Sequence, residues 1–240
     1  MTTSVFAFTA ALFLLGGIAV HASGQRYDGA AQHRRWIKFL VYFFIVHGAV
    51  ASAIAGPFCF ALLMTAIVLV GAFELRRIFL GKQLTRPWVI SFVSIGALYA
   101  YLAVMLIRFS LISTTAVLLF VYLVTASLDG FSQLTGQWIG RRRFVPKVSP
   151  NKTLEGAIGG AGAAILTAWV IRSWAELTPA MSILIGSSMA AAGIIGDLAA
   201  SYVKRLGGVK DFGRILPEHG GALDRFDSLF FTASIYFFLR

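Results

Sequence analysis

The sequence predicts an all-α protein, a polytopic transmembrane helix bundle of about eight spans whose polar loops form a site. Of its 240 residues, 58% are hydrophobic and only 13% are charged, whereas a soluble domain carries about a quarter charged residues. The apolar residues also come in runs, several close to the roughly 20 residues that a spanning helix needs. The runs are 4–20, 38–55, 58–75, 88–107, 109–127, 156–173, 180–199 and a short last one, 228–240.

The distribution of basic residues supports the same count independently. Cytoplasmic loops of membrane proteins collect Lys and Arg, and in an eight-span topology the loops on one side hold 18 of the 21 basic residues. Only Arg108, Arg172 and Arg240 fall on the other side. We therefore expect a multi-pass protein of the cell (inner) membrane with its site on the cytoplasmic side. The net charge of +11 suits a lipid bilayer and polyanionic substrates, and no nucleic acid is expected as a partner.

Residues 1–127 are interpreted as N-terminal transmembrane helices that form a scaffold facing lipid and a dimer partner. The run 4–20 has no basic region before it, so we expect a retained span rather than a cleaved signal peptide. Gly56 and Pro57 predict a tight turn between the second and third spans. Arg108 and its neighbours are expected to separate the fourth span from the fifth.

Polar residues within these first spans have structural interpretations. Glu74 ends the third span and is expected to form an interfacial ion pair with Arg76 or Arg77. Cys59, the single cysteine, is expected to be a small buried hydrophobic residue. His47 lies within a span and is interpreted as a packed polar group rather than a metal ligand.

Residues 128–240 are interpreted as the catalytic transmembrane region. The fifth span ends at Asp129, and the loop beyond it carries Arg141–Arg143, which are either topogenic anchors or phosphate contacts. In SPNKTLEG (residues 149–156), Ser149 and Pro150 predict the start of a helix. A helix N-terminus binds anions through its free N–H groups and its dipole. The polar side chains offered there are Asn151, Lys152 and Thr153.

The densest polar segment is SYVKRLGGVKDFGRILPEHGGALDRFD, residues 201–227, between two apolar segments. Charged residues at a membrane are costly and tend to mark function. Asp197 lies at the membrane end of the preceding span and needs a cationic partner, for which a metal ion serves well. Asp224 and Asp227 share a face if the last helix has begun there, and carboxylates are ligands that magnesium prefers. His219 has no serine or cysteine partner, so no covalent nucleophile is indicated.

The same segment resembles the signature of the phosphatidate cytidylyltransferase family, also called CDP-diglyceride synthetase. Sixteen positions fit: Ser201, Val203, Lys204, Arg205, Lys210, Asp211, Gly213, Leu216, Pro217, His219, Gly220, Gly221, Asp224, Arg225, Phe226 and Asp227. Ala222 departs from the family's larger apolar residue. SPNKTLEG and GDLAAS also resemble family segments, whereas the family's segment at Asp129 is altered at 132–134.

The resemblance implies transfer of the cytidylyl group of CTP to phosphatidic acid, giving CDP-diacylglycerol and pyrophosphate in phospholipid biosynthesis. It also implies a homodimer and magnesium (Mg2+), and a second, monovalent or divalent cation stays open. Asp197 and Asp224 match the family's metal-binding aspartates. The expected catalytic residues are Asp197, Lys210, Asp211, His219, Asp224 and Asp227. The expected substrate-binding residues are Asn151, Lys152, Thr153, Ser201, Lys204, Arg205 and Arg225.

Two alternative functions stay open at the level of sequence. A related CTP-dependent membrane enzyme acting on another lipid, such as an isoprenoid-ether phosphatidate analogue or a polyprenol, would carry a similar site. A transporter would also have many spans, but its site would be expected near the membrane midplane, whereas the charged residues here cluster in loops.

Overall fold

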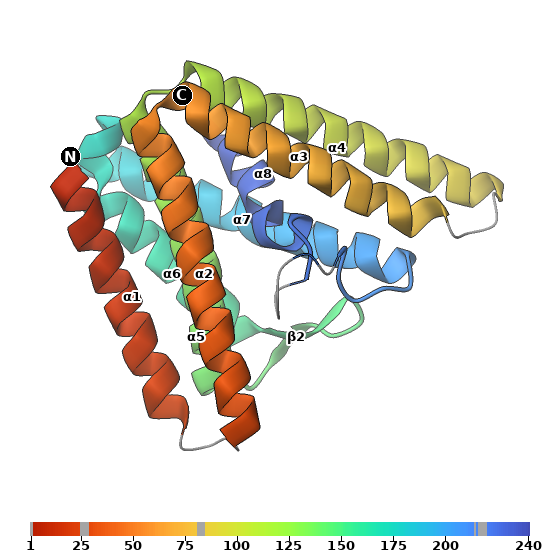
Figure 1. Cartoon of the computed structure of the whole chain (residues 1–240), viewed down its shortest axis with the longest axis horizontal. Coiled ribbons are helices and arrows are strands. Elements are labelled where there is room, and N and C mark those ends of the chain that lie inside the picture. Colours follow the sequence, from red (N-terminus) through yellow and green to blue (C-terminus); the bar gives the residue numbers. More distant parts are fainter. Residues whose placement is uncertain (1, 25–28, 81–84, 214, 216–219) are drawn as a thin grey trace.

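The computed structural model describes residues 2–24, 29–80, 85–213, 215 and 220–240, which form eight α-helices and one small β-hairpin (Figure 1). The helices are α1 Thr2–Gly24, α2 Gly29–Ala55, α3 Pro57–Leu80, α4 Arg86–Ile112, α5 Thr115–Ile139, α6 Leu154–Val170, α7 Pro179–Leu206 and α8 Leu223–Leu239. Strands β1 (Arg143–Val145) and β2 (Ser149–Thr153) pair antiparallel, and a 3-10 turn, η1, covers Arg172–Ala175. The all-α prediction is therefore confirmed.

Within the described part of the chain, five helices are long and apolar enough to cross a membrane: Gln32–Ala55, Pro57–Phe79, Arg86–Ile112, Thr115–Ile139 and Pro179–Leu206. The apolar parts of α1 and α6 are shorter, Thr3–Ile18 and Leu154–Val170. The helix of the last predicted span, α8, has 17 residues, close to the lower limit of about 17 for a span. The predicted bundle is thus present, and α6 and α8, with 17 residues each, are at the lower limit of spanning length.

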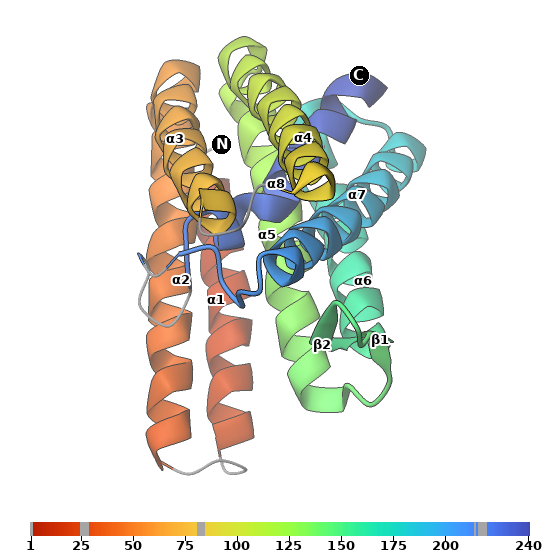
Figure 2. The same ribbon diagram turned by 90° about the vertical axis from the view of Figure 1, so that its right-hand side faces the viewer.

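Figures 1 and 2 show the helices as two antiparallel pairs packed around a central group. The pairs are α1–α2 and α3–α4, while α5 to α8 contact one another and α8 also packs on α3 and α4. The hairpin lies at one end of α5 and α6, and the connection from α7 to α8 runs near the same end (Figure 2). This arrangement gathers the polar segments of the second half of the chain.

Between α2 and α5, one predicted helix boundary is confirmed and one is wrong. Gly56 alone separates α2 from α3, at a φ of 127° that favours glycine, so the predicted turn is confirmed. The predicted break at Arg108 is wrong. Arg108 lies inside α4 with its guanidinium 5.9 Å from the ring centroid of Phe237, and the break comes at Ser113, before the N-cap Thr114.

Two side-chain expectations in the first half have different outcomes. Cys59 is exposed on α3 rather than buried, so that prediction is wrong. His47 packs against Phe43 with ring centroids 4.0 Å apart, and its Nδ1 lies 2.9 Å from the Phe43 carbonyl oxygen. The interpretation of His47 as a packed polar group is confirmed.

The three basic residues that the sequence assigns to the far side of the membrane lie at the end of the bundle away from the hairpin. Arg240 donates to the carbonyl of Ala175 and to the hydroxyl of Tyr236, 3.1 Å away. Arg172 lies in the same 3-10 turn as Ala175, and Arg108 contacts Phe237 of α8. The charge asymmetry is therefore reproduced in space, while the orientation in a membrane stays a prediction.

Small residues let α5 and α6 approach closely, as expected for membrane helices. A Cβ on Gly160 would lie 2.6 Å from the Leu128 carbonyl oxygen, and one on Gly156 would lie 2.8 Å from that of Ser132. A Cβ on Gly162 of the same helix would meet nothing within 4 Å. The glycines at 156 and 160 thus determine the spacing between the hairpin end of α6 and α5.

We expect Gly160→Val to separate α5 from α6 and to destabilise the protein by at least about 1–3 kcal/mol, the usual cost of overpacking. Thermal unfolding in detergent measures the effect. Gly162→Val is the matched control, because its side chain enters open space, and it should unfold close to the wild-type temperature. Equal losses in the two variants would contradict the close-packing interpretation.

Candidate active site

The polar segments enclose one cavity of about 590 Å³ between the hairpin, α5, α7, the α7–α8 connection and the start of α8. Eleven of the thirteen predicted site residues line it: Asn151, Lys152, Asp197, Ser201, Lys204, Arg205, Lys210, Asp211, Asp224, Arg225 and Asp227. Thr153 is buried beside it, and His219 lies outside the described residues. Segments far apart in the chain are therefore brought to one place.

The segment 149–156 reaches the cavity in a different way from the one predicted. Ser149–Thr153 is strand β2, paired with β1, and α6 begins only at Leu154. The predicted helix start at Ser149 is wrong because the hydrogen bonds of the hairpin outweigh the local capping signal. Thr153 is the true N-cap, and its hydroxyl accepts a hydrogen bond from the Gly156 N–H at 3.1 Å.

Glu155 holds the turn before the hairpin in place. Its carboxylate accepts hydrogen bonds from the backbone N–H groups of Arg141 (3.0 Å) and Arg142 (3.2 Å), which lower the pKa of Glu155. The arginines at 141–143 are exposed and do not line the cavity. This placement favours the anchor alternative for them over the phosphate-contact alternative.

Helix α7 supplies one wall, because it continues seven residues beyond the predicted span and ends at Leu206. Asp197, Ser201 and Lys204 follow one another at spacings of four and three, which places them on one face. Lys152 of β2 meets that face: its Nζ lies 2.5 Å from Asp197 Oδ2 and 3.4 Å from Ser201 Oγ. The cationic partner expected for Asp197 is thus Lys152 in this structure.

Arg205 ties the hairpin to the end of α7. Its Nε donates to the Val148 carbonyl at 3.1 Å, and its Nη1 donates to the Val209 carbonyl, also at 3.1 Å. The residue is exposed and lines the cavity. It therefore fixes the relative position of two walls while keeping its charge at the rim.

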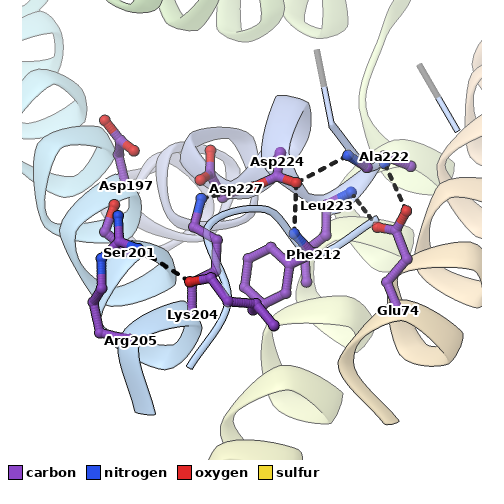
Figure 3. Close-up of polar contacts among 12 residues, drawn as sticks. Glu74, Asp197, Ser201, Lys204, Arg205, Phe212, Ala222, Leu223, Asp224 and Asp227 are labelled. Atoms are coloured by element: carbon purple, nitrogen blue, oxygen red, sulfur yellow. Dashed lines mark hydrogen bonds and ion pairs between the residues drawn. The ribbon is translucent and has the colours of Figure 1, made fainter. Parts of the chain in front are cut away.

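Asp224 organises the α7–α8 connection (Figure 3). Its side chain is only 2% exposed and its Oδ1 lies 2.6 Å from Lys204 Nζ. Its Oδ2 accepts hydrogen bonds from the N–H groups of Phe212 (2.8 Å) and Gly221 (2.9 Å). Both oxygens are thereby occupied by the chain's own donors, since a buried carboxylate must be paired. Asp224 as a metal ligand stays a prediction.

Glu74 is the second carboxylate that holds this connection, and the sequence interpretation of it is wrong. The side chain is buried and does not pair with Arg76 or Arg77, both of which are exposed. Instead it crosses from α3 to the start of α8, where its oxygens accept the N–H groups of Ala222 (3.1 Å) and Leu223 (2.9 Å; Figure 3). A carboxylate at a helix N-terminus satisfies free N–H groups and complements the dipole.

Asp129 and Ser228 are site residues that the predicted set does not contain. Asp129 lies within α5, which continues to Ile139, and accepts a hydrogen bond from Ser228 Oγ at 2.9 Å. Asp227 is buried beside them on α8, where the negative charges of Asp197 and Asp129 act on it. The sequence feature that points to Asp129 is its position at the end of an apolar run. Its partner Ser228 lies 99 residues later, so the contact itself is not visible in the sequence.

The lining is nearly balanced in charge. Among the described residues the basic side chains are Lys38, Lys152, Lys204, Arg205, Lys210 and Arg225. The acidic ones are Asp129, Asp197, Asp211, Asp224 and Asp227. A polyphosphate bound here would therefore leave an excess of negative charge that an added cation would neutralise.

The donor set fits a hard divalent cation by its chemistry. Asp197, Asp129 and Asp227 offer carboxylate oxygens around one cavity, and such oxygens are what magnesium prefers. Within the described part of the chain, no three His, Cys, Asp or Glu side chains are already gathered at metal-binding distances. Substrate phosphate and water would therefore supply part of the coordination, as is usual for magnesium.

Arg225 lines the cavity and, within the part of the chain that the structure describes, has one buried donor without an acceptor. Its Nε atom is buried, and the described residues give it no hydrogen-bond acceptor. The positive charge lies close enough to Asp129 and Asp227 to act on both. As a cation of the cavity wall, Arg225 can bind an anionic ligand through its guanidinium.

Comparison with known proteins locates the similarity in the part of the chain that carries the cavity. The model of the cytidylyltransferase family matches residues 89–240. The uncharacterized protein YnbB of Escherichia coli (strain K12) is 44% identical over 121 residues, which are 50% of this chain and 41% of that protein.

Other relatives carry a functional name, and two of them serve as examples. A phosphatidate cytidylyltransferase of Staphylococcus aureus (strain COL) is 39% identical over 117 residues, 48% of this chain and 45% of that protein. A phosphatidate cytidylyltransferase of Aquifex aeolicus (strain VF5) is 35% identical over 140 residues, 58% of this chain and 52% of that protein. The chain thus spans about half the length of the curated relatives it matches.

Proposed function

The chain belongs to the cytidylyltransferase family, and from that premise we propose that it transfers the cytidylyl group of CTP to phosphatidic acid. The products are CDP-diacylglycerol and pyrophosphate. Relatives that carry the name phosphatidate cytidylyltransferase support this substrate pair. The cavity supports it through its volume, about 590 Å³, which lies in the usual range of roughly 300–1,000 Å³ for ligand sites.

The observation that carries the proposal is a cavity lined by basic and acidic side chains, with Arg225 among the basic ones. A guanidinium binds phosphate oxygens strongly and with defined geometry. Lys210 stands at the rim and, with Arg205, can bind further phosphate oxygens. A triphosphate and a lipid phosphate can accept hydrogen bonds from these residues, whereas an apolar substrate cannot.

The reaction needs no covalent intermediate on the protein. The second pKa of a phosphate monoester is about 6. The phosphate of phosphatidic acid is therefore largely dianionic at neutral pH, and its oxygen can attack without a general base. Its oxygen forms a bond to the α-phosphorus of CTP, and the bond from that phosphorus to the bridging oxygen breaks. Pyrophosphate leaves with the electron pair. Positioning and charge neutralisation by the residues of the cavity then do most of the catalytic work.

Magnesium would be held by Asp197 together with Asp129 and Asp227, with Asp224 reached only if Lys204 is displaced. Bound there, it would neutralise the triphosphate and the leaving pyrophosphate. Lys152 would move from Asp197, its partner at 2.5 Å, to a substrate phosphate. Asn151 and Ser201 are further donors on the same wall.

The setting of the enzyme is part of the proposal. Five helices of spanning length support a multi-pass protein in a lipid bilayer. The basic residues around the cavity end favour the cytoplasmic side of the inner membrane. A homodimer is proposed from the family resemblance, and chemical crosslinking of the protein in membranes would test it.

The proposal predicts that purified protein with magnesium, phosphatidic acid and CTP labelled at the α-phosphate moves the label into the lipid phase. We expect Arg225→Gln to reduce this transfer by on the order of 10²-fold, because a charge-assisted phosphate contact contributes about 1.5–3 kcal/mol and the neighbouring aspartates lose their compensation. Arg141→Gln is the matched control, since Arg141 is exposed and outside the cavity, and should retain wild-type transfer.

Three results would separate the alternatives. Label that enters lipid in the wild type and in Arg141→Gln but not in Arg225→Gln supports the proposal. Equal transfer in both variants would remove Arg225 from the site. If phosphatidic acid accepts no label while a polyprenol or an ether-lipid phosphatidate does, the lipid acceptor is different and the nucleotide chemistry stands.

A further inference from the structure

A second cavity of about 340 Å³ lies between α1, α2 and α5, beside the polar cavity. Apolar side chains form most of its surface, including Leu12, Phe13, Phe39, Val46 and Leu123. Gly16 widens it on α1, where a Cβ would lie 3.1 Å from Phe39 Cε2. The volume lies at the lower end of the roughly 300–1,000 Å³ range of ligand sites. An apolar site of this kind takes an apolar ligand.

The two cavities share a wall. Lys38, Tyr42, Gly130, Gln133 and Gln137 line both of them. The Tyr42 hydroxyl donates to the Ala126 carbonyl of α5 at 2.8 Å, which fixes α2 against α5 at this junction. A ligand that lies across the junction would therefore place one end among apolar side chains and the other among the charged residues of the polar cavity.

Lys38 marks the junction with a positive charge. It is half-buried in α2, and the described residues give it no ion pair. Close by, Arg35 Nη2 donates to Gln137 Oε1 at 2.9 Å, which ties α2 to the end of α5. A lysine with an apolar stem and a charged head suits the boundary between a hydrocarbon chain and a phosphate.

We propose that the apolar cavity is the subsite for the acyl tail of the lipid acceptor, and that Lys38, which lines both cavities, binds the lipid phosphate. The inference rests on the proposed function and adds the place of the lipid's hydrophobic part. An amphiphile with one anionic head is the ligand class that matches a charged cavity beside an apolar one. A soluble nucleotide would leave the apolar cavity unfilled.

Different parts of the chain would then form the nucleotide site and the lipid-tail subsite. The family match begins at residue 89, so the α1 and α2 walls belong to the part of the chain outside it. The chemistry of CTP would thus be provided by the matched region, and the selection of the lipid tail by the N-terminal helices together with α5.

A pair of tryptophan variants on α1 tests the subsite. Leu12 lines the cavity, whereas Leu14 is 67% exposed on the same helix. We expect Leu12→Trp to raise the KM for dioleoyl phosphatidic acid by on the order of tenfold, the effect of losing a few methylene contacts. Its KM for dioctanoyl phosphatidic acid and for CTP should change much less. Leu14→Trp should match the wild type with both lipids.

Lys38→Gln tests the contact with the lipid phosphate separately from the contact with the acyl tail. We expect it to raise the KM for both lipids by on the order of tenfold, since one charge-assisted hydrogen bond is lost, and to leave the KM for CTP unchanged. A rise for CTP alone would remove Lys38 from the lipid subsite. Unchanged kinetics with both lipids in Leu12→Trp would overturn the assignment of the apolar cavity, and so would equal losses with both lipids.

A binding experiment without CTP keeps this inference distinct from the proposed reaction. Phosphatidic acid with a photoactivatable diazirine at the end of one acyl chain is irradiated with the wild-type protein, and the labelled residues are mapped by mass spectrometry. We expect labels on the cavity side chains of α1, α2 and α5. Labels only on outward-facing residues would overturn the subsite even if the enzyme is active. Labels in the cavity without nucleotide transfer would retain the subsite and remove the proposed reaction.

Discussion

Asp224→Asn is expected to lower turnover by on the order of 10²–10³-fold while the protein remains folded in the membrane. Removing one partner of a buried ion pair costs about 3–5 kcal/mol, and each 1.4 kcal/mol is tenfold in a population. The substitution destabilises the α7–α8 connection, because Asp224 accepts hydrogen bonds from Lys204 at 2.6 Å and from the Phe212 and Gly221 N–H groups. The fraction of molecules with an assembled site should therefore fall.

The measurement is the transfer of α-labelled cytidylyl groups into lipid at saturating CTP, with size-exclusion chromatography in detergent to verify folding. A double variant, Asp224→Asn with Lys204→Met, removes both charges of the pair and should regain thermal stability without regaining activity. Wild-type turnover in Asp224→Asn would show that neither the ion pair nor a metal at this position is needed.

Glu74→Ala is expected to have the second largest effect, although Glu74 lies on α3, outside the region that matches the family. Its removal leaves the buried Leu223 N–H and the partly buried Ala222 N–H without acceptors. Each such group costs about 1–3 kcal/mol. We expect a lower unfolding temperature and a turnover reduced by at least about tenfold, since the start of α8 carries Asp224, Arg225 and Asp227.

Two further variants show how Glu74 acts. Glu74→Gln keeps one acceptor oxygen and should lie between wild type and Glu74→Ala in both stability and turnover. Arg77→Ala tests the ion pair that the sequence suggested, and because Arg77 is exposed we expect wild-type stability and activity. If Arg77→Ala lost as much as Glu74→Ala, the capping role of Glu74 would be refuted.

Several site residues could be predicted from local sequence because their chemistry repeats in short segments. The polar density of 201–227 and the Asp197 at a membrane end identified the α7 and α8 walls. Asn151 and Lys152 were assigned to the site on the assumption of a helix N-terminus, yet they reach the cavity from strand β2. Their residue types correctly predicted that they belong to the site, but the predicted secondary structure was wrong. Strand pairing with Arg143–Val145 overrides the local capping motif.

The helical membrane class, the asymmetry of the basic residues and most of the polar set could be predicted without a structure, because hydrophobic runs, charge counts and fixed spacings are local properties of the chain. The partners of the polar groups could not. Glu74 caps a helix that starts 149 residues later, and Ser228 holds an aspartate 99 residues earlier. Such partners depend on how the helices pack. A buried carboxylate must be paired, and its hydrogen-bond donors are the groups that lie next to it in the folded protein, not the charged residues that lie next to it in the sequence.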